Sequence, residues 1–137
     1  MKKEDLMIGD WVIRRGVPEE PMRLYDMKTS AGLVYLDQDG RGVTEKFENI
    51  EPILLTHEIM EKNGFNLYPE ETNVFYLNAE YRHDLDTVCL YIGDIERPSI
   101  YGNDSLGEKT YVVLHCKYVH ELQHLLKLCG IEKEIIL

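Results

Sequence analysis

The chain has 137 residues, 44% of them hydrophobic, which is enough for one domain or for two very small ones that share a core. Its 25 acidic residues outnumber its 15 basic residues, and the resulting formal net charge of -10 disfavours a surface that tracks nucleic-acid phosphates. The sequence opens without a secretory leader pattern and contains no apolar run of membrane-spanning length. We therefore expect a cytoplasmic protein without membrane association.

The first fifty residues are predicted to form short strands. Strand-like stretches occupy residues 6–13, 22–27, 32–36 and 42–47, and turn signals separate them at residues 16–18, 28–32 and 37–40. Four or five short strands in so short a span favour a small, strongly bent sheet. We predict an SH3-like β-barrel subdomain over residues 1–52, which by itself implies no function.

Residues 53–137 are predicted to form a second, α+β subdomain. Thr56 is suited to cap a short helix over residues 57–63 that ends at Gly64. Strands are predicted over residues 73–78, 87–93 and 109–116, with a short edge strand at 99–101. A helix over about residues 118–129, ended by Gly130, and a terminal strand at 134–137 complete an α-β-β-β-α-β order. This order predicts an α+β fold with a mostly antiparallel second sheet.

The three cysteines lie within these apolar strand and helix patterns, at Cys89, Cys116 and Cys129. Their odd number and their surroundings favour reduced core thiols over a metal or redox role.

Residues 120–124 spell HELQH, which matches the H-E-x-x-H pattern of a zinc peptidase helix. Histidines four residues apart lie on one helix face, so His120 and His124 could share a metal while Glu121 acts as general base. A catalytic zinc site also needs a third protein ligand. The position six residues past His124, where the longer motif has a third histidine, is Gly130.

The other face of this helix is apolar. Leu122, Leu125, Leu126 and Cys129 form a stripe nearly opposite His120 and His124. If the stripe packs on the second sheet, the histidines face water. We therefore predict no catalytic residue, no metal and no cofactor, and keep a zinc site at His120 and His124 with Glu121 as the alternative.

Three blocks of the chain together resemble a family of small uncharacterised proteins. Residues 6–12 are similar to its L-x-I-G-N-W-V string, residues 52–65 to P-I-x-L-T followed by K-N-G-F, and residues 118–125 to Y-V-H-Q-L-Q-N-L. The family occurs in Bacteroidetes gut bacteria and in their prophages or mobile elements, and it brings no activity, substrate or cofactor. Its pattern has Gln at Glu121 and Asn at His124, so the resemblance implies that the family helix requires neither a base nor a second ligand.

Four aromatic residues of the first subdomain are candidates for a binding surface: Trp11, Tyr25, Tyr35 and Phe47. SH3-like modules use aromatic grooves to bind peptides, and aromatic residues also fill cores. The sequence leaves both interpretations open.

Three hypotheses for the function follow. The leading one is a non-enzymatic accessory or adaptor protein of a prophage or mobile element that contacts an unknown protein partner. The second is a nucleic-acid-associated module, with Arg14, Arg15 and Arg41 as a basic spot on the barrel, which the net charge disfavours. The third is a zinc-dependent hydrolase that uses the HELQH helix.

Overall fold

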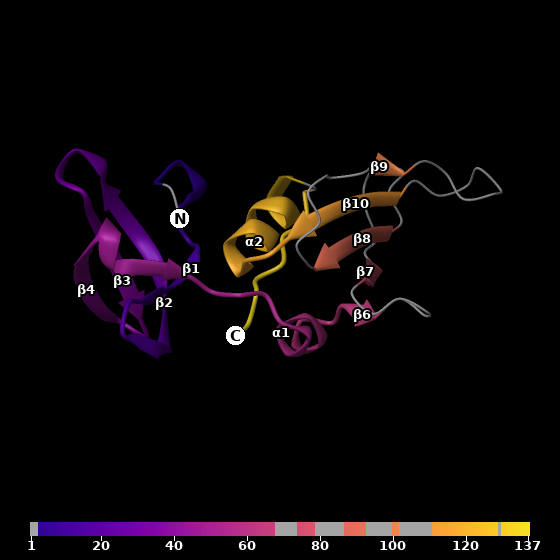
Figure 1. The fold of residues 1–137 in the computed structure, drawn as a ribbon, viewed down its shortest axis with the longest axis horizontal. Coiled ribbons are helices and arrows are strands. Elements are labelled where there is room, and N and C mark those ends of the chain that lie inside the picture. Colours follow the sequence, from indigo (N-terminus) through magenta and orange to yellow (C-terminus); the bar gives the residue numbers. More distant parts are fainter. Residues whose placement is uncertain (1–2, 68–73, 79–86, 93–99, 102–110, 129) are drawn as a thin grey trace. The chain divides into compact units, whose positions relative to one another are not determined.

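A computed structural model describes residues 3–67, 74–78, 87–92, 100–101, 111–128 and 130–137 (Figure 1). The chain forms two compact units. Unit 1 comprises Met1–Leu54 together with Tyr118–His124, and unit 2 comprises Leu55–Lys117 together with Leu125–Leu137. Sheets and helices both contribute, which confirms the predicted α+β class. Within the described residues, no helix is long and apolar enough to cross a membrane.

Unit 1 is built on a five-stranded antiparallel sheet with the order β4-β3-β2-β1-β5. Its strands are β1 (Trp11–Arg14), β2 (Val17–Lys28), β3 (Leu33–Gln38), β4 (Arg41–Lys46) and β5 (Ile50–Pro52). Three short 3-10 helices flank them: η1 (Lys3–Asp5), η2 (Thr29–Ala31) and η3 (Phe47–Asn49). The sheet does not close on itself, so the predicted barrel is not confirmed, whereas the run of short antiparallel strands is.

The turn between β3 and β4 fixes the register of this hairpin. Asp39 and Gly40 both have positive φ, 51° and 81°, as a two-residue type I′ turn requires. The Asp37 carboxylate accepts a hydrogen bond from the Gly40 N–H at 3.4 Å. The Asp-Gly pair thus places Gly42 opposite Asp37 in the ladder.

The core of unit 1 lies on one face of the sheet. Buried residues of the 6–50 region share it: Leu6, Val12, Met22, Leu24, Val34, Leu36 and Ile50. Their alternation along each strand follows from the two-residue period of β structure. Between Leu24 and Asp26 the register of β2 against β3 shifts, which makes Tyr25 the extra residue of a bulge.

Unit 2 carries the second sheet, with the order β6-β7-β8-β10-β9. Its strands are β6 (Asn66–Leu67), β7 (Val74–Asn78), β8 (Thr87–Ile92), β9 (Ile100–Tyr101) and β10 (Tyr111–Cys116). Of the strand pairs among the described residues of this sheet, only β8 and β10 run parallel, so the predicted mostly antiparallel sheet is confirmed. The short β9 lies at the edge as predicted, and β6 was not predicted.

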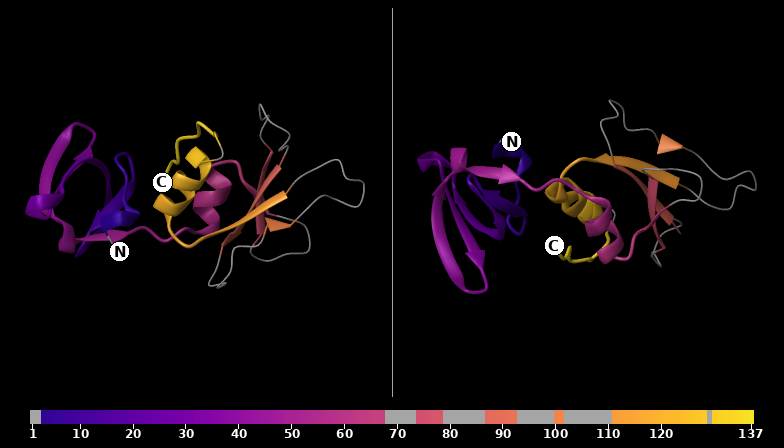
Figure 2. Two further views of the ribbon diagram at one scale, coloured as in Figure 1. Left: turned by 90° about the horizontal axis from the view of Figure 1, so that it is seen from above. Right: turned by 60° about the horizontal axis from the view of Figure 1, so that its bottom comes forward.

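The first helix of unit 2, α1 (His57–Lys62), begins at the predicted residue and ends one residue before the predicted end. The Thr56 hydroxyl accepts a hydrogen bond from the Ile59 N–H at 3.3 Å, and Gly64 has a φ of 76°. The His57 ring lies 4.9 Å from the Phe75 ring of β7, so α1 packs beside the sheet (Figure 2).

The predicted terminal strand at 134–137 is wrong, because residues 131–137 form no strand. The side-chain amide of Asn63 instead makes hydrogen bonds to the backbone of this terminal segment. Its Nδ2 donates to the Ile136 carbonyl at 2.8 Å, and its Oδ1 accepts from the Ile136 N–H at 2.9 Å. One buried amide therefore satisfies the backbone groups that a ladder would otherwise satisfy.

Candidate functional site

The HELQH residues lie at the start of α2 (Val119–Leu128), whose first half belongs to unit 1. The segment after β5 positions this start. The Val119 N–H donates to the Ile53 carbonyl at 2.9 Å, and Leu54 forms an isolated antiparallel bridge with Tyr118. The start of α2 is thereby held against residues 53 and 54.

Gln123 ties the helix to the entry of β1. Its Oε1 accepts a hydrogen bond from the Trp11 N–H at 3.0 Å, and its Nε2 donates to the Gly9 carbonyl at 3.1 Å. The amide thus serves both a backbone donor and a backbone acceptor of the loop before β1. Gln123 therefore fixes Gly9 and Trp11 against the first half of α2.

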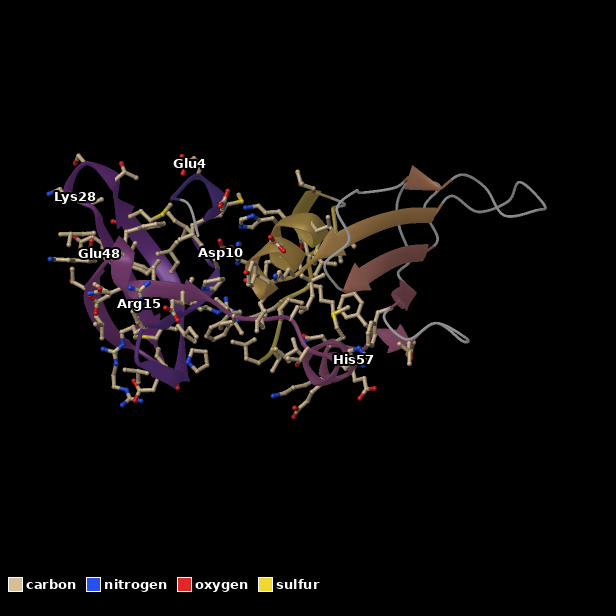
Figure 3. The ribbon with its side chains drawn as sticks, in the orientation of Figure 1. Glu4, Asp10, Arg15, Lys28, Glu48 and His57 are labelled. Carbon is tan, nitrogen blue, oxygen red and sulfur yellow. The ribbon has the colours of Figure 1, made fainter. Side chains whose placement is uncertain are left out.

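Asp10 forms the central polar contact of this region (Figure 3). Its side chain is 3% exposed, and His124 Nε2 lies 2.8 Å from Oδ1 and 2.9 Å from Oδ2. The Met7 N–H donates to Oδ2 at 2.7 Å. Burial raises the pKa of Asp10, while the Met7 hydrogen bond and His124 oppose that rise.

His120 is buried beside this pair, with 3% of its surface exposed. Its ring stacks on the Tyr118 ring at 5.7 Å and meets the His124 ring edge-on at 5.8 Å. Within the described part of the chain, its Nδ1 is buried and has no hydrogen-bond partner. Burial lowers the pKa of His120 below its usual 6.5.

The prediction that the histidines face water is therefore wrong. Leu122 and Leu126 are buried at 0% and 1% exposure, as the apolar stripe requires, yet His120 is buried too. Leu122 and His120 both belong to the half of α2 that lies in unit 1, so this half is covered on its apolar face and on part of its polar face. Helical periodicity identifies the apolar face but carries no information about a second contact made by polar side chains.

Glu121, the alternative general base, caps its own helix. Its Oε2 accepts a hydrogen bond from the Tyr118 N–H at 3.0 Å, which is the N3-to-N-cap half of a capping box. Together with Gln123 and His124, it is engaged in holding the helix. Among the described residues, no group of three His, Cys, Asp or Glu side chains gathers as a metal site would require.

A separate groove of about 560 Å³ lies on unit 1, over β2, β3 and β4. Eight residues line it: Tyr25, Tyr35, Leu36, Asp37, Gly40, Gly42, Val43 and Thr44. Tyr35 pairs with Thr44, and Asp37 pairs with Gly42, so these four side-chain positions share the face opposite the core. The bulge adds Tyr25, which is 70% exposed.

The structure brings together two of the four predicted aromatic residues. Tyr25 and Tyr35 line the groove. Trp11 lies farther along the same sheet, with the Arg23 guanidinium 4.7 Å above its ring. Phe47 packs against the core instead. Whether these residues bind a partner stays a prediction.

The predicted basic spot is partly neutralised by acidic neighbours. Arg14 pairs with Glu20 at 2.9 Å, and Arg15 pairs with Glu51 at 2.8 Å. Arg41 is exposed at the start of β4. Two of the three cations are therefore less available to phosphates than the sequence alone indicates.

Sequence reasoning missed Asp10, Gln123 and Gly42. Asp10 lies in the first predicted strand and Gln123 in the last predicted helix, and neither position indicates the contact that its side chain makes. The signal for Gly42 was present, because a glycine opposite Asp37 in an Asp-Gly hairpin leaves the ladder without a side chain there.

Comparison of the chain with protein-family models, with curated proteins and with solved structures finds no match.

Protonation of His120 is expected to destabilise the fold. The pKa of His120 in the folded chain lies below 6.5, so the unfolded chain takes up the proton first as the pH falls. The stability contributed by neutral His120 is thus complete above about pH 6.5 and is lost as the pH falls through the folded pKa. Urea unfolding of the wild type from about pH 7.5 down to about pH 5 should show this loss, whereas His120→Phe should show a weaker dependence.

The raised pKa of Asp10 changes the stability in the opposite direction. As the pH falls, the folded chain takes up the Asp10 proton before the unfolded chain does, so this protonation stabilises the fold. The effects of Asp10 and His120 on stability therefore oppose each other as the pH falls. Equal slopes for the wild type and His120→Phe over the window of the His120 titration would contradict the expectation.

Proposed function

We propose that the chain is a non-enzymatic cytoplasmic accessory or adaptor protein that acts through contacts with a protein partner. One observation carries the proposal. The groove on the face of unit 1 opposite its core is lined by two tyrosines, one of them largely exposed, while the HELQH side chains are engaged in holding their helix. Tyrosines are enriched where proteins meet because they combine a large apolar ring with a polar end.

We further propose that unit 1 is an SH3-like barrel that is not fully closed. Its strand order, the bulge in its long second strand and the 3-10 turn η3 before β5 support this assignment. The proposal that the protein belongs to a prophage or mobile element of Bacteroidetes rests on the three sequence blocks described above.

Two other functions are less well supported. A nucleic-acid module would need its cations gathered and available, and the glutamate partners of Arg14 and Arg15 oppose this. A zinc hydrolase would need the imidazole of His124 and the carboxylate of Glu121, which already accept or share other hydrogen bonds.

Zinc analysis tests the hydrolase alternative directly. Chain purified without a polyhistidine tag should contain well under one zinc per molecule, because Asp10 holds His124. A full equivalent of zinc that is lost in the His124→Ala variant would contradict this expectation and support the zinc-hydrolase hypothesis instead.

Photocrosslinking in the host cell tests the proposed function. With p-benzoylphenylalanine at Tyr25, we expect a discrete crosslinked product that contains one partner protein. The same group at Ser30, which is exposed on η2 and outside the groove, should give no such product. In a Gly42→Leu background the product should disappear, because a leucine there fills the groove. Equal products at both positions would contradict the proposal.

A further inference from the structure

The groove exists because one side chain is missing from the outer face of the sheet. Gly42 lies opposite Asp37 in the β3–β4 ladder, and a Cβ built on Gly42 would meet no atom within 4 Å. The neighbouring positions on that face carry Tyr35 and Thr44, so the glycine leaves a depression between a ring and a carboxylate. A ligand group can therefore approach the backbone of β4 there.

The charge of the groove is negative. Asp37 is the one ionised side chain among the eight lining residues. Among the cations that share its sheet face, Lys28 lies opposite Leu33 at the far end of β3, and two others are engaged elsewhere. Arg23, its cross-strand partner on β2, lies over the Trp11 ring, and Lys46 lies 3.9 Å from Glu48. A carboxylate beside two aromatic rings favours a cation, because the ring faces and the carboxylate both attract positive charge.

The chain itself contains an example of this contact. Trp11 pairs with Arg23 and Arg23 pairs with Asp37, so Trp11, Arg23, Asp37 and Gly42 form one row across the sheet. At one end of that row a guanidinium covers an aromatic ring at 4.7 Å. At the other end lie Asp37 and the open space over Gly42, with the groove tyrosines beside them.

Resting on the proposed function, we propose that this groove binds an extended, basic segment of the partner protein. An arginine or lysine of that segment lies beside Tyr25 and Tyr35 and pairs with Asp37, and its backbone passes over Gly42. Charge complementarity supports this choice, since the chain carries a net charge of -10 and a basic segment is attracted to it as a whole.

Titration with designed peptides tests the proposal. The probes are three capped eight-residue peptides in which alanine alternates with arginine, with citrulline or with glutamate. Citrulline keeps the shape of arginine and removes its charge. Backbone amide shifts of the full chain, measured by NMR, should place the arginine peptide on β3 and β4 with a dissociation constant of about 1 mM or below. The citrulline peptide should bind about two- to fivefold more weakly, and the glutamate peptide should not bind.

Three variants define the site. Asp37→Asn keeps an acceptor for the Gly40 N–H and should weaken arginine binding about two- to fivefold. Gly42→Leu should weaken it about tenfold or more, and its amide spectrum should stay dispersed because the added side chain meets open space. Ser30→Leu, an exposed position outside the groove, should bind like the wild type.

Failure of this inference is distinguishable from failure of the proposed function. Equal affinity for the arginine and citrulline peptides, or arginine binding unaffected by Gly42→Leu, would overturn the basic segment. If the crosslink at Tyr25 still forms and still depends on Gly42, the groove binds a partner of different chemistry and the proposed function stands. If arginine binding does not depend on charge or on Gly42 and the crosslink at Tyr25 is also absent, the basic segment and the proposed function are both contradicted.

Discussion

Leu122→Ala should destabilise the protein by about 2–5 kcal/mol, as truncation of a fully buried leucine does. Leu122 is 0% exposed on α2, in the half of the helix that belongs to unit 1. The loss combines the transfer of removed methyl groups with the cavity that remains, and close packing limits how far that cavity collapses. Chemical denaturation monitored by the fluorescence of Trp11, the single tryptophan, measures the change in the free energy of unfolding.

Leu128→Ala is the matched control for this measurement. Leu128 lies on the same helix but is 85% exposed, so its truncation should change stability by no more than about 0.5 kcal/mol. Alanine is also a better helix former than leucine, which removes a propensity loss as an explanation. Equal losses at the two positions would show that the buried face of α2 is assigned wrongly.

Local sequence patterns were sufficient for most elements of the fold. Thr56 and Gly64 bound α1 because capping chemistry depends on residues a few positions apart. The Asp39-Gly40 turn was recognisable for the same reason, since positive φ at two successive positions selects those residue types. The alternation of apolar residues in β3 likewise follows from one buried face.

Contacts between distant parts of the chain were not accessible to such patterns. Asp10 and His124 are 114 residues apart, and neither has a local feature that names the other. The terminal segment was mistaken for a strand because its apolar residues fit one, whereas the Asn63 amide holds it without a ladder. The groove is a mixed case. The Asp39-Gly40 turn already fixes the register that brings Asp37 opposite Gly42, whereas the bulge that adds Tyr25 depends on the pairing of β2 with β3.

The same long-range contact engages a side chain of the H-E-x-x-H string. The motif fixes residue types and a helical spacing, and both are present. Zinc chemistry also requires free ligand atoms that converge on one point, and here His124 points to Asp10 while Glu121 turns back to the helix start. In this helix, Glu121 and His124 make hydrogen bonds that hold the start of α2 within unit 1.

Removal of the Asp10 carboxylate is expected to destabilise the protein by about 3–5 kcal/mol, as the loss of one partner of a buried ionisable pair does. Asp10→Ala leaves the Met7 N–H and His124 Nε2 without their acceptor, and both groups then lack a partner in a region from which water is largely excluded. Asp26→Ala is the control. Asp26 is exposed and, among the described residues, accepts a hydrogen bond only from its neighbour Met27, so the change there should stay within about 0.5 kcal/mol.

A double-mutant cycle separates the Asp10–His124 contact from the other effects of the Asp10 substitution. The stabilities of Asp10→Ala, His124→Ala and the double variant, measured by urea unfolding, should give a coupling energy of about 1.5–3 kcal/mol, the range for hydrogen bonds to charged groups. His124→Ala alone should cost less than Asp10→Ala, because Met7 keeps its acceptor. Additive losses, with no coupling, would mean that Asp10 acts only through the loop before β1, and that the helix is held there by Gln123 and its apolar face instead.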